Sequence, residues 1–552
     1  MPVVKLRYSE LVDLLGRKVP RETLLDTIPM LGADLERVEG DEWGVEFFPN
    51  RPDLYSPPGV ARALRAYLGL RPGLVRYPVG SSRWRVDVAP SVRKVRPVLV
   101  GALVDGVRMD DRRIQSLMDL QEDLHWGLGA RRRKVSIGVH DRAALSPPLA
   151  YEAVPPDSVS FVPLQGEKEM TLREILAEHP KGRAYAHLLA GSPRYPLLCD
   201  AKGQVLSFPP IINGTLTTVT GTTRDLFVDV TGTDEIACRR ALAIVAAHFA
   251  EDGAKLRAVT IRAGARRVRT PDLSPSRRTL DPARARALLG FDLSPRDMAA
   301  CLARMGHRAS FSRGRLRVES PAWRTDLLHE VDLVEDVAIG HGYREVPETA
   351  PRSVTFGAPL ASERVGEAAR EAMLGLGYSE VMTLSLTSDR ESHEALHVLR
   401  SRVTLANPIT EDHTIVRTSL LPSLLSILRA NVRRDLPQQI FEVGDVVTPV
   451  PKGPPENRRM LAAVRIAPRA SFTEAKSLAQ ALLRDLALPW QIRATEHGAF
   501  VEGRCGGLFR DDEPWGVFGE IHPRTVEAFG LGNPVIALEL RLPLRPLAEG
   551  PA

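Results

Sequence analysis

The segment from Ala322 to Tyr343, AWRTDLLHEVDLVEDVAIGHGY, constrains the fold more tightly than any other stretch of the chain. Its apolar residues recur at the period of an α-helix and predict one helix with an apolar stripe along one side. Asp326 stands at the front, where a carboxylate can cap the first turn. The stripe consists of Leu327, Val331, Val334 and Ala338.

The same segment carries three acids on the face opposite the stripe, where residues three and four positions apart are neighbours. These acids are Asp332, Glu335 and Asp336. Carboxylates on one face repel one another, so a hard divalent cation or a basic partner surface would stabilise them. A solvated acidic helix face fits the same residues, and the residues alone favour this interpretation.

The whole chain has 552 residues, which is too long for one hydrophobic core and predicts about three or four domains. Its net charge of +6 is small for this length, so it permits a nucleic-acid partner without requiring one. The 4 cysteines form no CxxC pair, and neither a structural zinc site nor a disulfide framework is predicted.

We expect a cytoplasmic protein with no membrane partner. The amino terminus lacks the basic and apolar regions of a signal peptide. No apolar run approaches the roughly 18 residues that a membrane-spanning helix needs.

Apolar periodicity and turn residues predict an α+β, multidomain chain in four parts. The first is an N-terminal α+β domain, the second is mixed, and the third has two helices, two strands and a helix, as in a winged-helix module. The fourth has an antiparallel sheet with helices on one side. A linker rich in Pro, Ser and Arg runs from Val268 to Thr279. The four parts are residues 1–85, 86–268, 272–350 and 355–552.

The second part contains a stretch in which small polar side chains gather beside glycines. It runs from Tyr195 to Asp234 and includes the amide of Asn213 and the carboxylate of Asp229. Such groups at strand ends suit a small polar pocket. A plain β-rich structure with threonines in its strands and a helix cap fits these residues equally well.

Taken together, the motifs of the chain resemble the β subunits of phenylalanyl-tRNA synthetase in their archaeal and eukaryotic cytosolic form. The resemblance covers nearly the whole chain and rests on motifs in the family's order. They are FFPNRPDLY with GVARAL, VSIGVHD, FPPIING with TRDLFVDVTGTD, WRTDLLHEVDLVEDVAIGHGY, LANPITEDHTIVRTSLLPSLL, IFEVGDVV and FGEIHP.

The resemblance implies that residues 86–268 form an editing domain that hydrolyses misacylated Tyr-tRNA(Phe). A site shaped for phenylalanine rejects tyrosine poorly if it only tolerates an extra hydroxyl, so a second site is useful. We expect a positioned water, helped by the terminal ribose of the tRNA, and no His or Cys nucleophile. The residues carried over from the family are Leu198, Ser207, Asn213, Asp229 and Thr231.

The resemblance also gives the acidic helix a role, because its acids match a magnesium site that the family shares with its α subunit. Magnesium keeps several waters, so not all four acids need to contact the ion. The implied partners are the α subunit, in an α2β2 heterotetramer, and tRNA(Phe), with ATP as a substrate of the complex. The implied magnesium residues are Asp326, Asp332, Glu335 and Asp336.

The last domain resembles a class II synthetase core without its chemistry. Class II chemistry needs a motif arginine opposite an acid, and IFEVGDVV offers the acid, Glu442, without an arginine in the same strand. We therefore predict no aminoacylation catalysis on this chain. Two other functions stay open on the sequence: a freestanding hydrolase that edits in trans, and a winged-helix protein that binds nucleic acid by itself.

Overall fold

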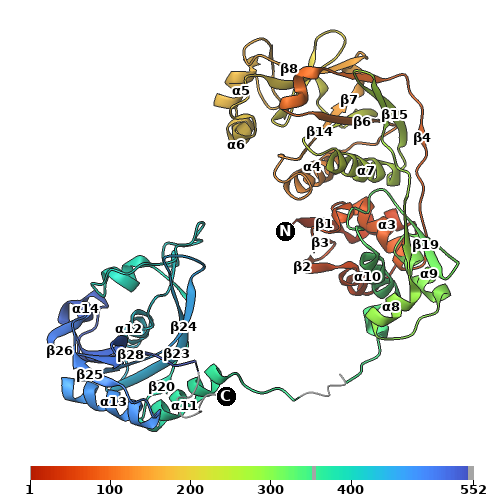
Figure 1. Ribbon diagram of the computed structural model, residues 1–552. Helices are drawn as coiled ribbons and strands as arrows, with labels where there is room; N and C mark the ends of the chain where they lie inside the picture. Colours follow the sequence, from red (N-terminus) through yellow and green to blue (C-terminus); the bar gives the residue numbers. More distant parts are fainter. Residues whose placement is uncertain (1, 351–355, 545–552) are drawn as a thin grey trace. The chain divides into compact units, whose positions relative to one another are not determined.

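The computed structural model describes residues 2–350 and 356–544, and it shows a mixed α+β chain of several sheets (Figure 1). The chain divides into two compact units, residues 1–350 and 351–552. Residues 355 and 545–552 of the predicted last domain lie outside the described residues. No helix in the described part of the chain is long and apolar enough to cross a membrane.

The N-terminal unit begins with a small sheet in the order β1-β3-β2. The residues of β1 alternate, so Val4 and Leu6 are buried while Val3 and Lys5 are exposed. Ser56 caps α3 by accepting a hydrogen bond from the backbone N–H of Gly59. The elements are β1 (Val3–Arg7), α1 (Tyr8–Leu15), α2 (Arg21–Thr27), β2 (Ala33–Glu39), β3 (Glu42–Phe47) and α3 (Pro57–Tyr67).

An 11-stranded sheet forms most of this unit, with β13-β12-β11-β8-β5-β15-β6-β14-β7 as its main path. Helices α4 (Asp111–Trp126) and α7 (Glu235–Glu251) cover one face of its β6–β14–β7 end (Figure 1). The short α5 (Leu172–Glu178) and α6 (Pro180–Tyr185) lie beyond β8 in the chain. The strands are β4 (Val79–Gly80), β5 (Arg85–Val88), β6 (Val98–Asp105), β7 (Val135–Asp141), β8 (Leu149–Val154), β11 (Tyr195–Cys199), β12 (Val205–Phe208), β13 (Ile212–Asn213), β14 (Asp225–Gly232), β15 (Lys255–Ala263) and β16 (Arg266–Thr270).

A three-stranded sheet, β17-β19-β18, and three helices complete the N-terminal unit. The prediction of two strands here was one short. Strand β17 lies in the stretch predicted as a linker, because its residues pair in register with β19. The elements are β17 (Ser276–Leu280), α8 (Pro282–Leu289), α9 (Pro295–Arg304), β18 (Arg308–Ser312), β19 (Arg315–Ser320) and α10 (Glu330–His341).

Helix α10 is shorter than the predicted helix from Ala322 to Tyr343, because it begins only at Glu330. The carboxylate of Asp332 accepts hydrogen bonds from the backbone N–H groups of Leu328 and His329, each at 2.6 Å. This cap fixes the start of the helix at Glu330. The prediction that Asp326 caps the helix is therefore wrong.

The buried face of α10 also differs from the predicted stripe. Val331 is 48% exposed, whereas Leu333 and Val337 are fully buried. Asp336 is only 2% exposed, although the spacing placed it on the solvent side. A buried carboxylate needs a partner, and Arg324 supplies it as described below.

The C-terminal unit contains a seven-stranded sheet in the order β20-β23-β24-β28-β27-β26-β25. Helices lie on both faces, not on one as predicted, because its strands are apolar on both sides. Leu461 packs with α11 and α13, and its neighbour Ala462 packs with α12 and α14. The elements are α11 (Ala361–Gly375), β20 (Ser379–Glu380), α12 (Leu421–Ala430), β23 (Gln438–Thr448), β24 (Glu456–Ile466), α13 (Phe472–Asp485), β25 (Gln491–Ala494), β26 (Phe500–Arg510), β27 (Glu513–Ile521), α14 (Pro523–Ala528) and β28 (Val535–Arg541).

Candidate functional site

One face of strand β14 is polar at two positions, and this face forms the centre of the candidate site. Phe227, Asp229 and Thr231 share it, because alternate residues of a strand point the same way. The opposite face carries Leu226, Val228 and Val230, which pack into the core with α7. Asp229 and Thr231 are 1% and 0% exposed, so both polar groups depend on partners within the protein.

His140 is the partner of Asp229. It lies on β7, which pairs with β14, and its Nε2 is 2.7 Å from Asp229 Oδ1. The carboxylate can only accept, so Nε2 carries the proton and donates it. In the neutral ring Nδ1 then accepts from the hydroxyl of Thr217, at 2.7 Å. The sequence predicted no His or Cys nucleophile, and it did not identify His140 as a member of this site.

Gly138 makes room for the Asp229–His140 contact. It stands directly opposite Asp229 in the β7–β14 ladder. A Cβ atom at this position would lie 2.2 Å from Asp229 Oδ1 and 2.8 Å from His140 Nε2. Such distances are far shorter than van der Waals contact, so only glycine allows the pair to form as it stands.

We therefore expect Gly138→Ala to displace the Asp229–His140 pair and to slow any hydrolysis at this site by about tenfold or more. Overpacking should also lower the free energy of unfolding by about 1–3 kcal/mol. The measurement is ester hydrolysis of tyrosyl-tRNA(Phe) by the purified complex. Gly221→Ala is the matched control, because a Cβ there meets only the carbonyl oxygen of Met109, at 3.9 Å. An unchanged rate in Gly138→Ala would contradict the role of the pair.

The remaining predicted residues lie in one row across neighbouring strands. Leu198 on β11 is opposite Ser207 on β12, which in turn is opposite Asn213 on β13. Leu198 also faces Tyr151 on β8 and packs in the same core as Phe227. The side chains of Ser207 and Asn213 form no hydrogen bond to other described residues, which leaves them free for a ligand.

Arg96 connects this row with Thr231. Its Nε donates to the Thr231 hydroxyl at 3.0 Å, and its Nη2 donates to the Thr231 carbonyl at 2.8 Å. The Tyr151 hydroxyl donates to the Arg96 carbonyl at 2.9 Å. Burial lowers the pKa of Arg96, and Asp229 is among the groups that counteract this. The five predicted residues therefore belong to one connected region, although four of them are buried and only Asn213 is partly exposed.

The four acids of the predicted magnesium site lie near one another, but three of them are engaged within the protein. Arg324 Nη2 lies 2.7 Å from Asp326 Oδ2 and 2.7 Å from Asp336 Oδ2. Asp332 is engaged with the backbone of the first turn of α10. Only Glu335 remains exposed, and partial burial and its three acidic neighbours raise its pKa.

Asp336 is held more firmly than the other acids. His307 Nε2 lies 2.6 Å from the same Asp336 Oδ2 that Arg324 contacts. Burial would raise the pKa of Asp336, but Arg324 and His307 outweigh it and lower the pKa to about 2. Among residues 2–350 and 356–544, no three His, Cys, Asp or Glu side chains are arranged to hold a metal ion. Three of the four predicted acids are therefore engaged within this chain.

The same ionic cluster reaches the N-terminal domain through the motif NRPDL. Arg51 Nε donates to Asp53 Oδ1 at 2.8 Å, and both side chains are buried. The guanidinium of Arg62 lies 3.6 Å from Asp53 and 4.6 Å from the ring centroid of Trp323. Arg51 and Asp53 therefore pair across the turn, and Arg62 links this pair to Trp323.

In the C-terminal unit, Glu442 is engaged inside the protein. Arg417 Nη1 donates to its Oε1 at 2.8 Å, and the Thr383 hydroxyl donates to its Oε2 at 2.6 Å. Glu442 is 2% exposed. The arginine opposite this acid comes from outside the strand, and it satisfies the acid internally.

Comparison with known proteins places this geometry in a family. Residues 346–542 match the phenylalanyl tRNA synthetase beta chain CLM domain, and residues 278–343 match the tRNA synthetase B5 domain. The chain is 44% identical to the phenylalanine–tRNA ligase beta subunit of Archaeoglobus fulgidus, over 98% of each chain. It is 45% identical to that of Methanothrix thermoacetophila, over 99% of this chain and 100% of the relative.

The fold gives the same answer for the N-terminal part. A solved N-terminal fragment of the phenylalanyl-tRNA synthetase beta subunit from Pyrococcus horikoshii superposes with a TM-score of 0.60. It is 36% identical in sequence and covers 62% of this chain and 100% of the fragment. Sequence similarity of this strength over nearly the full length shows that the chain belongs to the phenylalanine–tRNA ligase β-subunit family and is an aminoacyl-tRNA synthetase subunit.

Proposed function

We propose that the face of β14 with Asp229 and Thr231, together with the row from Leu198 to Asn213, is an editing site for tyrosyl-tRNA(Phe). The observation that carries this proposal is the connected set of polar groups around Asp229. A tyrosine differs from phenylalanine by one hydroxyl, and a site with polar groups is able to select it. Ser207 and Asn213 are the free groups for that hydroxyl, and the partly exposed Asn213 marks the side from which substrate approaches.

The reaction at this site is hydrolysis of the aminoacyl ester. A water oxygen attacks the ester carbonyl carbon, and the bond from that carbon to the ribose oxygen breaks. The ribose oxygen takes a proton, and free tyrosine and tRNA(Phe) are the products. His140 acts by holding the Asp229 carboxylate in place through the 2.7 Å contact, so we assign it a positioning role.

The direct experiment measures deacylation of tyrosyl-tRNA(Phe) by the purified complex of this chain with its α subunit. Hydrolysis well above the rate of the ester in buffer supports editing. A complex that charges phenylalanine normally but leaves the tyrosyl ester intact would rule it out.

We further propose that the α subunit carries the aminoacylation chemistry, with ATP as its substrate, and that this chain supports it in an α2β2 complex with tRNA(Phe). Glu442 supports the proposal, because it is 2% exposed and held by Arg417 and Thr383, so this acid is closed to a substrate. We assign residues 86–268 as the editing domain, 272–350 as winged-helix-like and 355–552 as class II synthetase-like. We also propose that the complex works in the cytoplasm.

An apolar stripe of the C-terminal unit offers a contact surface for the α subunit. Met382 and Leu384 are 93% and 67% exposed, and Leu386 continues the same alternation at 38%. A row of large, exposed apolar side chains often marks an interaction site.

We expect Met382→Ser and Leu384→Ser each to weaken association with the α subunit by about tenfold or more, because each loses about 1.5–3 kcal/mol of apolar burial. Sedimentation of the mixed subunits measures the effect. Val432→Ser is the control, since Val432 is 55% exposed and lies just after the end of α12, outside the stripe. Equal association of the stripe variants and the control would place the α subunit elsewhere.

For magnesium we propose a site that the second subunit completes. Glu335 is the one acid of the predicted four that is exposed, and it forms no hydrogen bond or ion pair with another described residue. Magnesium commonly takes one or two carboxylates and keeps several waters, so one carboxylate from this chain is compatible with such an ion. Asp332 would then cap α10, while Asp326 and Asp336 would stay paired with Arg324.

A further inference from the structure

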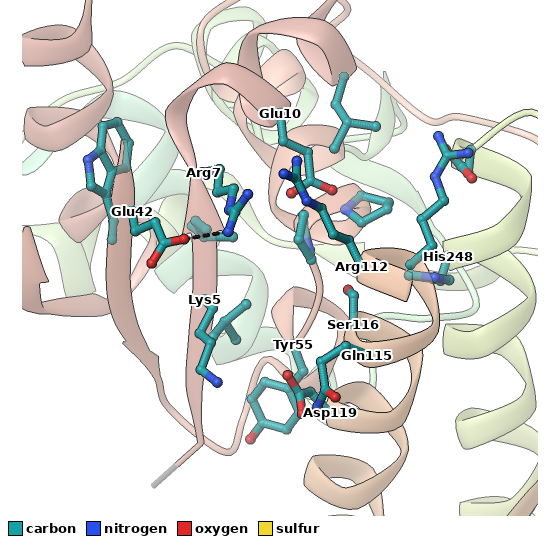
Figure 2. A pocket seen from close by; sticks show the side chains of 18 of the residues that line it. Lys5, Arg7, Glu10, Glu42, Tyr55, Arg112, Gln115, Ser116, Asp119 and His248 are labelled. Atoms are coloured by element: carbon teal, nitrogen blue, oxygen red, sulfur yellow. Dashed lines mark hydrogen bonds and ion pairs between the residues drawn. The ribbon is translucent and has the colours of Figure 1, made fainter. Parts of the chain in front are cut away.

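A cavity of about 1020 Å³ lies in the N-terminal unit between the β1–β3–β2 sheet and helix α4. Figure 2 shows Lys5 and Arg7 of β1 on one side and Gln115, Ser116 and Asp119 of α4 on the other. Leu6, Leu117 and Val245 belong to one hydrophobic core, so the elements that enclose the cavity are packed together. None of the five predicted editing residues is among its lining residues.

Strand β1 presents a free edge to this cavity. Within the described residues, β1 pairs with β3 and with no other strand. Its residues from Val3 to Arg7 all line the cavity, without a gap. Alternate side chains of a strand point to opposite faces, so an unbroken run is expected where the backbone edge borders the space.

The backbone hydrogen bonds show which groups that edge offers. Phe47 donates its N–H to the Pro2 carbonyl, and Tyr8 donates to the Asp41 carbonyl. In an antiparallel pair, hydrogen-bonded positions alternate, so the even-numbered residues of β1 face β3. The odd-numbered residues therefore turn their N–H and C=O groups toward the cavity. These residues are Val3, Lys5 and Arg7.

Three further buried polar atoms line the cavity without a partner. They are Trp43 Nε1, the Tyr55 hydroxyl and His248 Nδ1, on side chains that are 1%, 2% and 8% exposed. Burial lowers the pKa of His248 to about 4, so its ring is neutral at pH 7. Buried polar atoms nearly always have partners, and the Trp43 N–H in particular requires an acceptor.

The charge of the cavity points to a basic ligand. Its lining holds nine Asp and Glu side chains against five Lys and Arg, although the whole chain is net positive at +6. Arg113 is already paired with Asp252 at 3.1 Å. Burial and the neighbouring Asp119 and Glu122 raise the pKa of Asp123 to about 6, as expected for a partly buried carboxyl beside other acids.

We propose that this cavity binds an extended, basic peptide segment of a partner chain, which adds to the free edge of β1 as a further strand. The peptide backbone pairs with the outward N–H and C=O groups of Val3, Lys5 and Arg7. Its Lys or Arg side chains meet the carboxylates of α1 and α4, among them Glu10, Asp119 and Asp123. Strand addition of this kind takes affinity from the main chain and specificity from the side chains.

The test uses the full chain and a capped heptapeptide of alternating valine and lysine, measured by calorimetry and by hydrogen exchange of residues 2–8. Saturable binding and slower exchange of these amides are expected. Two matched peptides serve as controls, one with glutamate in place of lysine and one with proline at its centre. Both should bind at least about tenfold more weakly, since one loses charge attraction and the other a backbone donor.

Protein variants separate edge pairing from other contacts. Lys5→Pro removes an N–H that β3 does not use, and proline is tolerated on edge strands. We expect it to weaken peptide binding by about tenfold relative to Lys5→Ala, which keeps the N–H. Asp119→Asn combined with Asp123→Asn should weaken binding by a further factor of about five to ten.

The proposal is overturned by any of three results. These are no saturable binding up to about 1 mM peptide, equal binding of the glutamate peptide, and equal binding to Lys5→Pro and Lys5→Ala. Far-ultraviolet circular dichroism of Lys5→Pro shows whether the sheet remains intact, and Val3→Pro, at the next outward position, replaces it if the sheet is lost.

Discussion

Asp229→Ala is expected to slow deacylation of tyrosyl-tRNA(Phe) by about a hundredfold or more, the scale for loss of a positioned acid–base group. Phenylalanine charging by the complex should stay unchanged, so tyrosyl-tRNA(Phe) should accumulate. The reason is structural: Asp229 is the centre of the polar set, with His140 and Thr217 behind it. Parallel charging and deacylation assays measure both rates.

Alanine at this buried position also risks disturbing the fold, because it leaves His140 without its acceptor. Asp229→Asn provides the second variant, since its amide oxygen has the same shape and still accepts from His140. A slow rate in Asp229→Asn, with normal phenylalanine charging, shows that the charge itself is required. Full deacylation by both variants would show that Asp229 is not required and that other residues carry out the editing.

Asp336→Asn is expected to destabilise the N-terminal unit by about 3–5 kcal/mol, the usual cost of removing one member of a buried ion pair. Arg324 would keep its charge in a buried position, with Asp326 as its remaining carboxylate. Denaturant unfolding followed by tryptophan fluorescence measures the change in the transition that contains Trp323. The pKa of Asp336, about 2, lies below the ordinary value, so its contribution is present above about pH 4 and is lost as pH falls toward 2.

Glu335→Gln separates stability from metal binding. Glu335 is exposed, so this variant should unfold like the parent chain, while magnesium bound by the purified complex should fall. The opposite pattern, in which Asp336→Asn is stable but depleted of magnesium, would show that Asp336 binds the ion and that the ion displaces Arg324 from it.

The sequence predicted much of the local structure because periodicity is a local property. The alternation along DLFVDVTG correctly placed Asp229 apart from Leu226 and Val228 on β14. The order of the motifs identified the family, which the full-length similarity confirms. The register that brings Leu198, Ser207 and Asn213 into one row was not predicted, because pairing between strands depends on contacts that neighbouring residues do not encode.

His140 shows the same limit. The motif VSIGVHD contains it, yet it lies 89 residues from Asp229 in the chain, and no local pattern relates the two. The sequence contains one signal for this contact. A glycine two positions before a histidine in a buried strand leaves space for a side chain from the next strand. Gly138 fills that role.

For the acidic segment around α10, the sequence by itself determined that a helix forms and that it carries four acids near one another. Only the tertiary structure decided what neutralises them. The carboxylate of Asp336 pairs with Arg324 at 2.7 Å and with His307 at 2.6 Å. Arg324 precedes α10 in the chain, and His307 directly precedes β18. The physical reason is that helical spacing states which side chains share a face, whereas burial and ion pairing depend on what packs against that face.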